Sequence, residues 1–359
     1  MRVFKVLYTG DYLDQNGDVV RKGIGLDLLA NVPYIQTGFL TDQQPQPNDP
    51  TYWDRLYHLE ITPQHVADAN GLVVCRPWVK ASAFSRGASN LVAIGRAGAG
   101  YDKIDLEACT ANDVVVFNSP DTLVHSTASA ALVFILALAK RLPEHERMAH
   151  TGCWDRQSQI SGDDLPGQTL GIVGLGHTGA ELARLVAPFK MRLLAYSPRA
   201  DAAKAVNLGV QLLPTLDELF RESDFISLHC RLEPHTRGMI GEREFRLMKP
   251  TAYFINVARG ELVRQNDMVR ALREGWIRGA GLDVFEEEPL PASDPLAELD
   301  NVILTPHWLP ATRQAGFATM TSIAEGMRRI ATGRIPDHIL NPAVLERRTF
   351  RAKLSRLAQ

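Results

Sequence analysis

A glycine triplet, Gly174, Gly176 and Gly179, constrains the fold of this chain more than any other feature of its sequence. The apolar run Leu170–Val173 precedes the triplet, a helical repeat of apolar residues follows it, and a second apolar run ends at Tyr196. Strand, tight turn, helix and strand within about 30 residues make this spacing indicative of dinucleotide binding, with the phosphates on free N–H groups at the helix start. The alternative is a glycine-rich turn in an α/β protein that binds nothing.

The end of the second strand bears on which dinucleotide binds. An NAD site usually has an acidic residue there, about 20 residues after the glycines, which bonds the ribose 2′-hydroxyl. Here the position is Ser197, followed by Pro198 and Arg199. With no carboxylate to repel a 2′-phosphate and an arginine close by, the sequence favours NADP(H). The alternative is NAD(H) bound through Ser197, with Arg199 a solvated surface charge.

Composition excludes several other classes of protein. The chain has 359 residues, enough for two domains, and 39 basic against 41 acidic residues give a net charge of −2. That balance gives no reason to expect nucleic acid or membrane-surface binding, and the longest apolar run, Ala130–Ala139, is too short to span a bilayer. The scattered cysteines, Cys75, Cys109, Cys153 and Cys230, favour reduced thiols in a cytoplasmic protein over a disulfide framework or metal site.

Strand and helix patterns alternate along the chain. We predict strands at residues 3–8, 71–75, 91–95 and 114–117, which would form a small parallel-sheet domain. Residues 121–151 read as one long helix whose middle is apolar on nearly every face, as expected for burial between domains or subunits. After the glycine triplet, strands at 225–229, 252–256, 280–284 and 302–304 extend a doubly wound sheet of six or seven strands.

Polar residues stand just after several of these strands, where ligands bind in doubly wound sheets. They are His229, Asn256, Arg259, Asp283, Glu288 and His307. Arg259 could bind a carboxylate through two hydrogen bonds. His307 could exchange a proton with a developing alkoxide, and Glu288 could bond its other ring nitrogen and fix the tautomer. Taken singly, each is equally well explained as a surface ion pair, a charged run or a loop histidine.

The combination of motifs resembles the D-isomer-specific 2-hydroxyacid dehydrogenase family. The motifs that carry the resemblance are the glycine triplet, NVARGELV at 256–263, GLDVFEEEP at 281–289, TPH at 305–307, FISLHCRLEPHTRGMIG at 225–241 and GRAGAGYDKID at 95–105. They stand in the family's order and cover roughly residues 71–318. The resemblance implies reduction of a 2-keto acid to a D-2-hydroxy acid, or the reverse, with a nicotinamide cofactor.

The resemblance also assigns roles to individual residues. It implies that Arg259 binds the substrate, that Glu288 is the partner of the histidine and that His307 is the acid/base. Backbone N–H groups of Ala99 and Gly100 would meet the substrate carboxylate. The cofactor would contact His177 and Thr178 at the pyrophosphate and, toward the nicotinamide, His229, Val257, Ala258 and Asp283. No metal site is expected.

The family fold implies two doubly wound parallel-sheet domains. A Rossmann cofactor domain, 123–308, would be inserted in a split, flavodoxin-like substrate domain formed by 1–122 and 309–359. The long helix in such proteins usually serves a homodimer interface, so we expect a homodimer.

Two departures from the family pattern affect the prediction. The acidic residue is replaced by Ser197, which supports NADP(H), and the usual I-G-G after the histidine is replaced by Trp308-Leu309-Pro310. This bulky, stiff turn favours a larger or more apolar 2-keto acid. The alternative function is a non-catalytic NAD(P) sensor or corepressor on the same fold, although a binder would not need Arg259, Glu288 and His307 together. The N-x-x-R-G and T-P-H motifs argue against another Rossmann enzyme, such as a methyltransferase.

Overall fold

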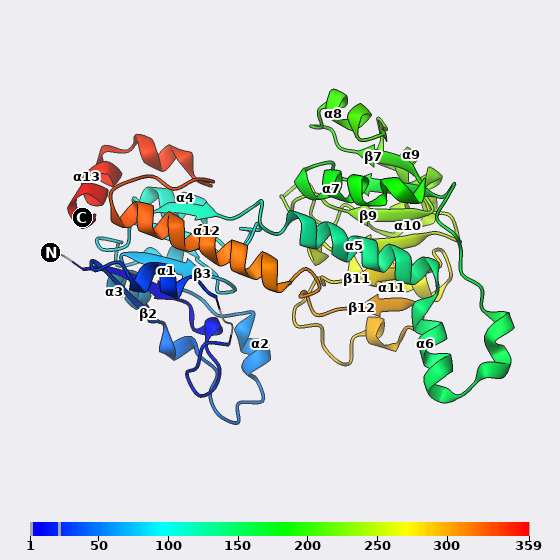
Figure 1. Ribbon diagram of the computed structural model, residues 1–359, viewed down its shortest axis with the longest axis horizontal. Helices are drawn as coiled ribbons and strands as arrows, with labels where there is room; N and C mark the ends of the chain where they lie inside the picture. Colours follow the sequence, from blue (N-terminus) through cyan, green and yellow to red (C-terminus); the bar gives the residue numbers. More distant parts are fainter. Residues whose placement is uncertain (1–2, 21–22, 359) are drawn as a thin grey trace. The chain divides into compact units, whose positions relative to one another are not determined.

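The computed structural model describes residues 3–20 and 23–358. The chain folds into two compact units, one formed by Met1–Leu123 with Thr312–Gln359 and the other by Val124–Ala311. Figure 1 shows that each unit is a sheet with helices on it, coloured blue to cyan and orange to red in the first, and green to yellow-orange in the second.

The first unit contains a five-stranded parallel sheet in the order β2-β1-β3-β4-β5. Its strands are β1 (Phe4–Tyr8), β2 (Ile35–Phe39), β3 (Gly71–Val74), β4 (Ala93–Arg96) and β5 (Val115–Asn118). The short runs of β-branched and apolar residues in β3 and β5 are buried along their whole length, as expected for parallel strands covered on both faces. This order is that of a flavodoxin-like sheet.

Helices and 3-10 turns cover both faces of this sheet. They are η1 (Gly10–Tyr12), α1 (Leu26–Ala30), η2 (Thr41–Gln43), α2 (Tyr52–Leu56), α3 (Pro63–Asp68), η3 (Ala81–Phe84), α4 (Leu106–Ala111), α12 (Arg313–Ala331), η8 (Pro342–Glu346) and α13 (Arg348–Leu357). The C-terminal segment is fastened to β5 by Asn341, whose side chain accepts from Val116 N–H at 2.8 Å and donates to the Val114 carbonyl at 2.9 Å. That buried amide explains why residues after 312 complete the first unit.

The second unit contains a seven-stranded parallel sheet in the order β12-β11-β10-β9-β6-β7-β8. Its strands are β6 (Thr169–Val173), β7 (Arg192–Tyr196), β8 (Val210–Leu212), β9 (Phe225–Leu228), β10 (Tyr253–Asn256), β11 (Gly279–Leu282) and β12 (Val302–Leu304). Counted from β6, this is the Rossmann order 3-2-1-4-5-6 with one further strand. The two sheets confirm the predicted fold class.

Two buried clusters, one on each face of this sheet, hold most of the helices of the second unit. The elements are α5 (Val124–Ala139), α6 (Leu142–Thr151), η4 (Trp154–Gln159), α7 (His177–Val186), η5 (Ala187–Phe189), α8 (Ala202–Asn207), α9 (Leu216–Glu222), α10 (Glu242–Leu247), η6 (Gly260–Leu262), α11 (Gln265–Arg273) and η7 (Pro295–Glu298). Helices α5 and α7 pack in the cluster on one face of the sheet, and α9, α10 and α11 pack in the cluster on the other face.

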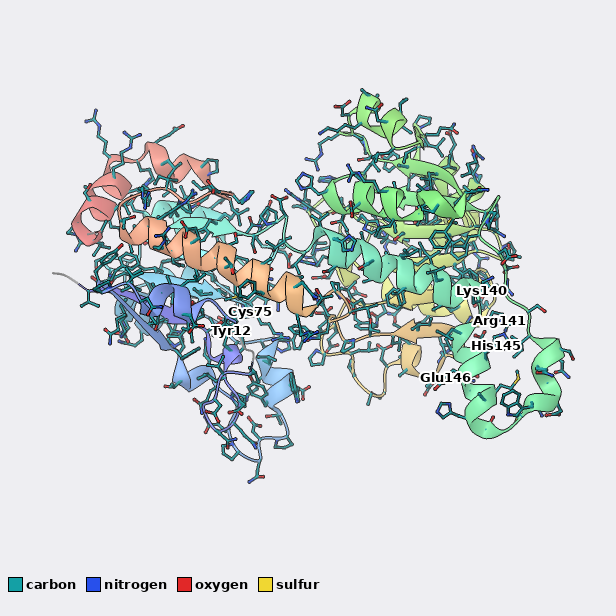
Figure 2. All side chains as sticks on the ribbon, viewed as in Figure 1. Tyr12, Cys75, Lys140, Arg141, His145 and Glu146 are labelled. Atoms are coloured by element: carbon teal, nitrogen blue, oxygen red, sulfur yellow. The ribbon has the colours of Figure 1, made fainter. Side chains whose placement is uncertain are left out.

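The prediction of one helix over residues 121–151 is wrong. The chain forms α5 and α6, which are bent by 61° relative to each other. The break falls at Lys140 and Arg141, where Arg141 takes a left-handed conformation with φ 51° before Pro143 in the first turn of α6 (Figure 2). A non-glycine residue at positive φ ends the α-helical path. Within this single chain, α6 buries none of its residues and Val133 of α5 is exposed.

Within residues 3–20 and 23–358, no single helix is long and apolar enough to cross a membrane, and only the bent pair α5–α6 passes that test together. The four cysteines form no disulfide. No group of three or more potential metal-ligating His, Cys, Asp or Glu side chains was found in this part of the chain.

Candidate active site

The three glycines of the dinucleotide motif have different surroundings. Gly174 follows β6 with φ 95°, and its N–H donates to the Tyr196 carbonyl at 2.9 Å. A Cβ on Gly179 would lie 2.3 Å from the Gly174 carbonyl oxygen, so helix α7 packs onto the turn only with glycine there. A Cβ on Gly176 would meet no atom within 4 Å. The second glycine therefore faces open space, where a pyrophosphate could approach the backbone.

Helix α7 begins directly at this turn. Gly176 is its N-cap and supplies no side-chain hydrogen bond, and His177 and Thr178 form its first turn. An α-helix leaves its first N–H groups without intrahelical partners and carries a partial positive charge at this end. The ten-residue helix thus presents donors suited to an anion beside the open space at Gly176.

The ribose end of the motif lies after β7. Ser197 is half-buried, and Arg199 is exposed, with 83% of its side chain accessible. The guanidinium of Arg199 lies 3.5 Å from a carboxylate oxygen of Glu233, in the segment that follows β9. The positive charge that we associate with a 2′-phosphate is therefore accessible, but an acidic side chain stands close to it.

His229 follows β9 beside the glycine turn. Its N–H donates to the Val173 carbonyl at 2.8 Å, and its Nε2 lies 2.9 Å from the hydroxyl of Ser227. Burial lowers the pKa of His229 to about 4, which keeps the imidazole neutral near pH 7. Ser227 was not among the predicted site residues, although a lone hydroxyl in the apolar run Phe225–Leu228 is a signal that could have indicated it.

His307 and Glu288 form a hydrogen-bonded pair. Nδ1 of His307 lies 2.8 Å from Glu288 Oε2, and the other carboxylate oxygen accepts from the Phe285 N–H at 3.2 Å. Burial alone would raise the pKa of Glu288, but the hydrogen bond and charge of His307, with the Phe285 N–H and the charge of Arg259, lower it below its ordinary value. The ionised carboxylate therefore holds Nδ1, and the imidazole is 37% exposed, which leaves Nε2 for another partner.

Arg259 lies in the loop that follows β10. The side chain of Asn256, at the end of that strand, accepts from Ala258 N–H at 3.0 Å and donates to the Arg259 carbonyl at 2.9 Å. A Cβ on Gly260 would lie 1.9 Å from both the carbonyl carbon and oxygen of Phe285, so this loop is in close contact with the one that carries Glu288. The two loops are thereby fixed to each other, and Arg259, Glu288 and His307 belong to one folded unit.

Asp283 connects β11 with the turn after His307. Its Oδ1 accepts from the Thr305 hydroxyl at 2.6 Å and from the N–H groups of Trp308 and Leu309, both at 3.1 Å. Burial raises the pKa of this carboxyl against these bonds and the charge of His307. Within the described residues, its Oδ2 is buried and has no hydrogen-bond partner. Asp283 therefore shapes the turn and keeps one acceptor unsatisfied.

The remaining predicted residues lie on both units. Val257 is buried and Ala258 half-buried after β10, in the second unit. Ala99 and Gly100 follow β4 in the first unit. Trp308, the first residue of the Trp308-Leu309-Pro310 turn, is 38% exposed. The structure thus places His307, Glu288 and Arg259 within one unit, and their roles and the carboxylate-binding backbone stay predictions.

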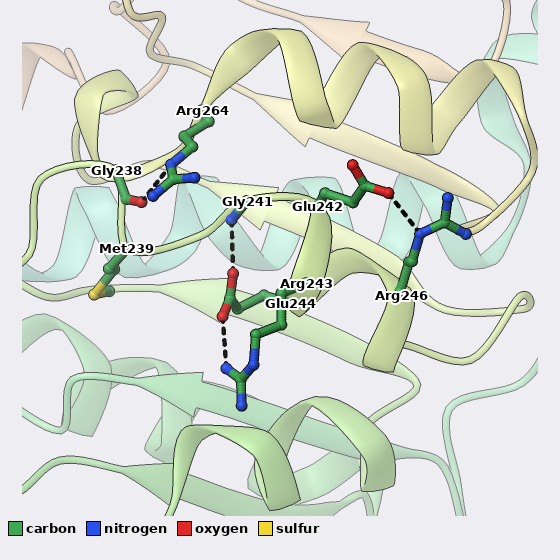
Figure 3. A pocket seen from close by; sticks show the side chains of 8 residues that line it. All are labelled: Gly238, Met239, Gly241, Glu242, Arg243, Glu244, Arg246 and Arg264. Atoms are coloured by element: carbon green, nitrogen blue, oxygen red, sulfur yellow. Dashed lines mark hydrogen bonds and ion pairs between the residues drawn. The ribbon is translucent and has the colours of Figure 1, made fainter.

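A cavity of about 570 Å³ lies elsewhere in the second unit, around α10 and the start of α11. Figure 3 shows Arg243 bonded to Glu244, and Arg246 bonded to Glu242. None of the predicted site residues lines this cavity. The candidate site therefore lies at the carboxyl ends of the strands, outside this cavity.

Comparison with known proteins decides the family. Residues 132–308 match the model of the "D-isomer specific 2-hydroxyacid dehydrogenase, NAD binding domain". A glyoxylate reductase from Korarchaeum cryptofilum is 40% identical over 264 residues, which are 72% of this chain and 79% of that protein. The chain belongs to the D-isomer specific 2-hydroxyacid dehydrogenase family. This is a family of NAD(P)-dependent oxidoreductases, so the predicted family and enzyme class are confirmed.

Two further relatives extend the comparison. A D-3-phosphoglycerate dehydrogenase from Methanocaldococcus jannaschii is 40% identical over 71% of this chain, but the chain spans only 48% of that protein's length. The crystal structure of a protein from Thermus thermophilus superposes with a TM-score of 0.77 at 29% identity, over 94% of this chain and 100% of that one. Thus similarity extends over both units of the fold.

Proposed function

We propose that this dehydrogenase reduces a 2-keto acid to a D-2-hydroxy acid, or runs the reverse reaction, with His307 as acid/base. The observation that carries the proposal is the hydrogen bond of 2.8 Å between His307 Nδ1 and Glu288, whose loop is in close contact with the loop that carries Arg259. A nicotinamide bound at the glycine turn would supply the hydride. The names of the relatives, glyoxylate reductase and D-3-phosphoglycerate dehydrogenase, support this class of reaction.

The chain's own residues account for the movement of the proton. Glu288 accepts from Nδ1, so the neutral imidazole has its acceptor at Nε2, and the imidazolium has a donor there. In the direction of reduction, Nε2 would give its proton to the oxygen that becomes the alcohol. In the direction of oxidation, Nε2 would take the proton from the alcohol. The Glu288 carboxylate would then stabilise the positive charge that develops on the imidazole. Arg259 would hold the substrate carboxylate and orient the carbonyl toward His307.

For the cofactor, we propose NADP(H) over NAD(H). The exposed guanidinium of Arg199, after Ser197, supports this preference, and the nearby carboxylate of Glu233 opposes it. The open space at Gly176 and the N–H groups of His177 and Thr178 fit the pyrophosphate of either cofactor. His229, Val257, Ala258 and Asp283 are the proposed contacts toward the nicotinamide.

We also propose that Ala99 and Gly100 bind the substrate carboxylate through backbone N–H groups.

We further propose that the enzyme is a homodimer. Large apolar side chains of the α5–α6–η4 region are exposed, which supports burial against a second copy: Val133 at 52%, Leu142 at 56% and Trp154 at 64%. Multi-angle light scattering would test the oligomeric state directly. A monomer at micromolar concentration would contradict it.

The experiment that tests the function is steady-state reduction of glyoxylate, hydroxypyruvate, pyruvate and phenylpyruvate, each with NADH and with NADPH. We expect turnover of at least one keto acid, chiral analysis giving the D product, and a preference for NADPH. No turnover with any pair, together with calorimetric binding of a nicotinamide cofactor, would favour the sensor function instead. Preference for NADH would assign the ribose site to Ser197 alone.

A further inference from the structure

The cavity around α10 and the start of α11 has no part in the proposed reaction. Its volume of about 570 Å³ is within the range of small-molecule sites in proteins, roughly 300–1,000 Å³. Besides Gly238, Met239 and Gly241, it is lined by five charged side chains, which are Glu242, Arg243, Glu244, Arg246 and Arg264. A cavity of this size with so many charged groups indicates a charged ligand.

The two carboxylates of the lining are already paired with arginines. Glu242 accepts from Arg246 Nε at 2.8 Å and, through its other oxygen, from Arg270 at 3.0 Å. Glu244 accepts from Arg243 at 2.9 Å. Because guanidinium groups neutralise both acidic side chains, neither would attract a cation as the ligand.

Arg264 differs from the other arginines of the lining. Its Nε donates to the Gly238 carbonyl at 3.1 Å, and Figure 3 shows its guanidinium between Gly238 and Gly241. Among residues 3–20 and 23–358, neither terminal nitrogen of Arg264 has a hydrogen bond or an ion pair. The guanidinium is thus fixed at one edge and keeps two adjacent donor groups, the arrangement that binds a phosphate or a carboxylate through two hydrogen bonds.

Two glycines allow Arg264 to lie against the backbone in this way. A Cβ on Gly241 would be 3.1 Å from Cδ of Arg264, which is closer than ordinary van der Waals contact. Gly238 has φ 60°, and a Cβ there would be 3.5 Å from Nε of Arg264. The position of this guanidinium therefore comes from backbone contacts, so its charge is not spent on a neighbouring carboxylate.

The wall of the cavity is hydrogen-bonded to the loop that carries Arg259. Gly238 N–H donates to the Glu261 carbonyl at 2.8 Å, and Arg264 N–H donates to the Ile240 carbonyl at 2.8 Å. Glu261 belongs to η6, which follows Arg259 directly. A ligand that moves Arg264 and the wall would therefore also move the loop of Arg259.

We propose that this cavity binds a small metabolite whose phosphate or carboxylate is held by Arg264, and that its occupancy changes the affinity for the keto acid at Arg259. None of the residues proposed for substrate or cofactor lines the cavity, so the site is a separate one. Its volume leaves room for an organic group beside the anion. The anion site stands without the proposed function, and the effect on the keto acid rests on it.

The binding test uses ligands that differ in charge. Glucose 6-phosphate and tricarballylate carry the two candidate anions, and glucose is the uncharged match. Each is titrated into the protein by calorimetry with saturating NADP+ present, so that the glycine turn is occupied. We expect saturable binding of at least one of the two anions and none of glucose. The tighter of the two identifies phosphate or carboxylate as the group that Arg264 holds.

Variants assign the binding to this cavity. Arg264→Gln should weaken the anion at least about tenfold, since a charge-assisted contact would be lost, and Arg264→Lys should restore part of the affinity. Arg273→Gln is the matched control, because it removes an exposed arginine at the other end of α11, outside the cavity. It should leave the affinity within about twofold. Unchanged thermal midpoints show that the variants are folded.

The effect on the reaction is measured with the best keto acid. The saturating anion should change its KM at least about twofold in the unmodified protein and leave it unchanged in Arg264→Gln, because the effect passes through that side chain.

The outcomes that would overturn the inference are distinct. No binding of either anion, or equal binding by Arg264→Gln and the unmodified protein, would refute the site. Binding that leaves KM unchanged would refute the effect on Arg259. A protein that turns over no keto acid would refute the proposed function and that effect with it, whereas the calorimetric titration would still decide on the anion site.

Discussion

At the scale of single residues, the structure separates the groups that would move the proton from those that hold them. His307 has one nitrogen bonded to Glu288 and a partly exposed ring. Glu288 is in turn held by the Phe285 N–H, and its pKa is lowered mainly by His307 against the effect of burial. Under the proposed function, His307 would exchange the proton and Glu288 would orient the imidazole ring.

Changing His307 to Ala should lower kcat for keto acid reduction by about 10²–10⁴-fold, the usual contribution of a general acid. Binding of the cofactor, measured by calorimetry or nicotinamide fluorescence, should stay within about twofold, because the glycine turn is untouched. Glu288→Gln keeps the size of the partner and should cost less than His307→Ala. An unchanged kcat in the His307 variant would refute its role.

Arg199→Gln should reduce kcat/KM with NADPH at least about tenfold and change the value with NADH little, since a charge-assisted contact to a phosphate would be lost. Glu233→Gln should have the opposite effect, because the Arg199 guanidinium would no longer lie beside a carboxylate. Lys190→Gln is the control, as it removes an exposed cation at the far end of the motif's helix. Equal losses with both cofactors would contradict this assignment.

At the scale of elements, two glycines of the dinucleotide motif have different roles. Gly179 is needed for the packing of helix α7, and Gly176 is the proposed point of contact with the pyrophosphate. A Cβ at Gly179 would meet the Gly174 carbonyl at 2.3 Å, whereas a Cβ at Gly176 would meet nothing within 4 Å. Gly176 has φ −81°, which an alanine can adopt. Gly179→Ala should therefore reduce stability, whereas Gly176→Ala should reduce cofactor binding.

Gly179→Ala should lower the free energy of unfolding by about 1–3 kcal/mol, the usual cost of overpacking. Gly176→Ala should leave the thermal midpoint nearly unchanged and weaken binding of NAD(P)H at least about tenfold, since the methyl group would occupy the space proposed for the pyrophosphate. Thermal unfolding and calorimetric titration of both variants check this. Undiminished cofactor affinity in Gly176→Ala would remove the pyrophosphate from this position.

Much of the element order was predictable because buried parallel strands leave short apolar runs between turn residues. Strands such as β3 and β9 stand out in this way. Pro143 could have indicated the break between α5 and α6, because a proline inside a helical pattern ends or kinks the helix. The left-handed conformation of Arg141 has no such signal, since neither glycine nor asparagine stands there. The contact of Gly260 with Phe285 could not be predicted from the sequence either. It joins two loops that come close only because β10 pairs with β11.

At the scale of the whole molecule, stability should depend on pH through a buried imidazole. The pKa of His229 is about 4 in the fold and near 6.5 in an unfolded chain. As pH falls from 6.5 to 4, the unfolded chain binds a proton that the folded chain does not, so the free energy of unfolding falls. Above pH 6.5 this group contributes no pH dependence.

His229→Gln should flatten the loss of stability between pH 6.5 and 4. Urea denaturation at several pH values, for the unmodified protein and this variant, checks the slope. His150→Gln is the matched control, because that histidine is exposed on α6. An equal slope in the His229 variant and the unmodified protein would show that this imidazole does not titrate as its burial requires.

Arg259, Glu288 and His307 all come from one uninterrupted stretch, Val124–Ala311, and the chain crosses between the two units only at that stretch's two ends. Ala99 and Gly100, the proposed groups for the substrate carboxylate, belong to the other unit. Under the proposed function, an ancestor could therefore have exchanged one acid for another by mutations in the first unit without altering the residues that handle hydride and proton. Such a division lets descendants of one reductase diversify in what they consume while inheriting one chemistry.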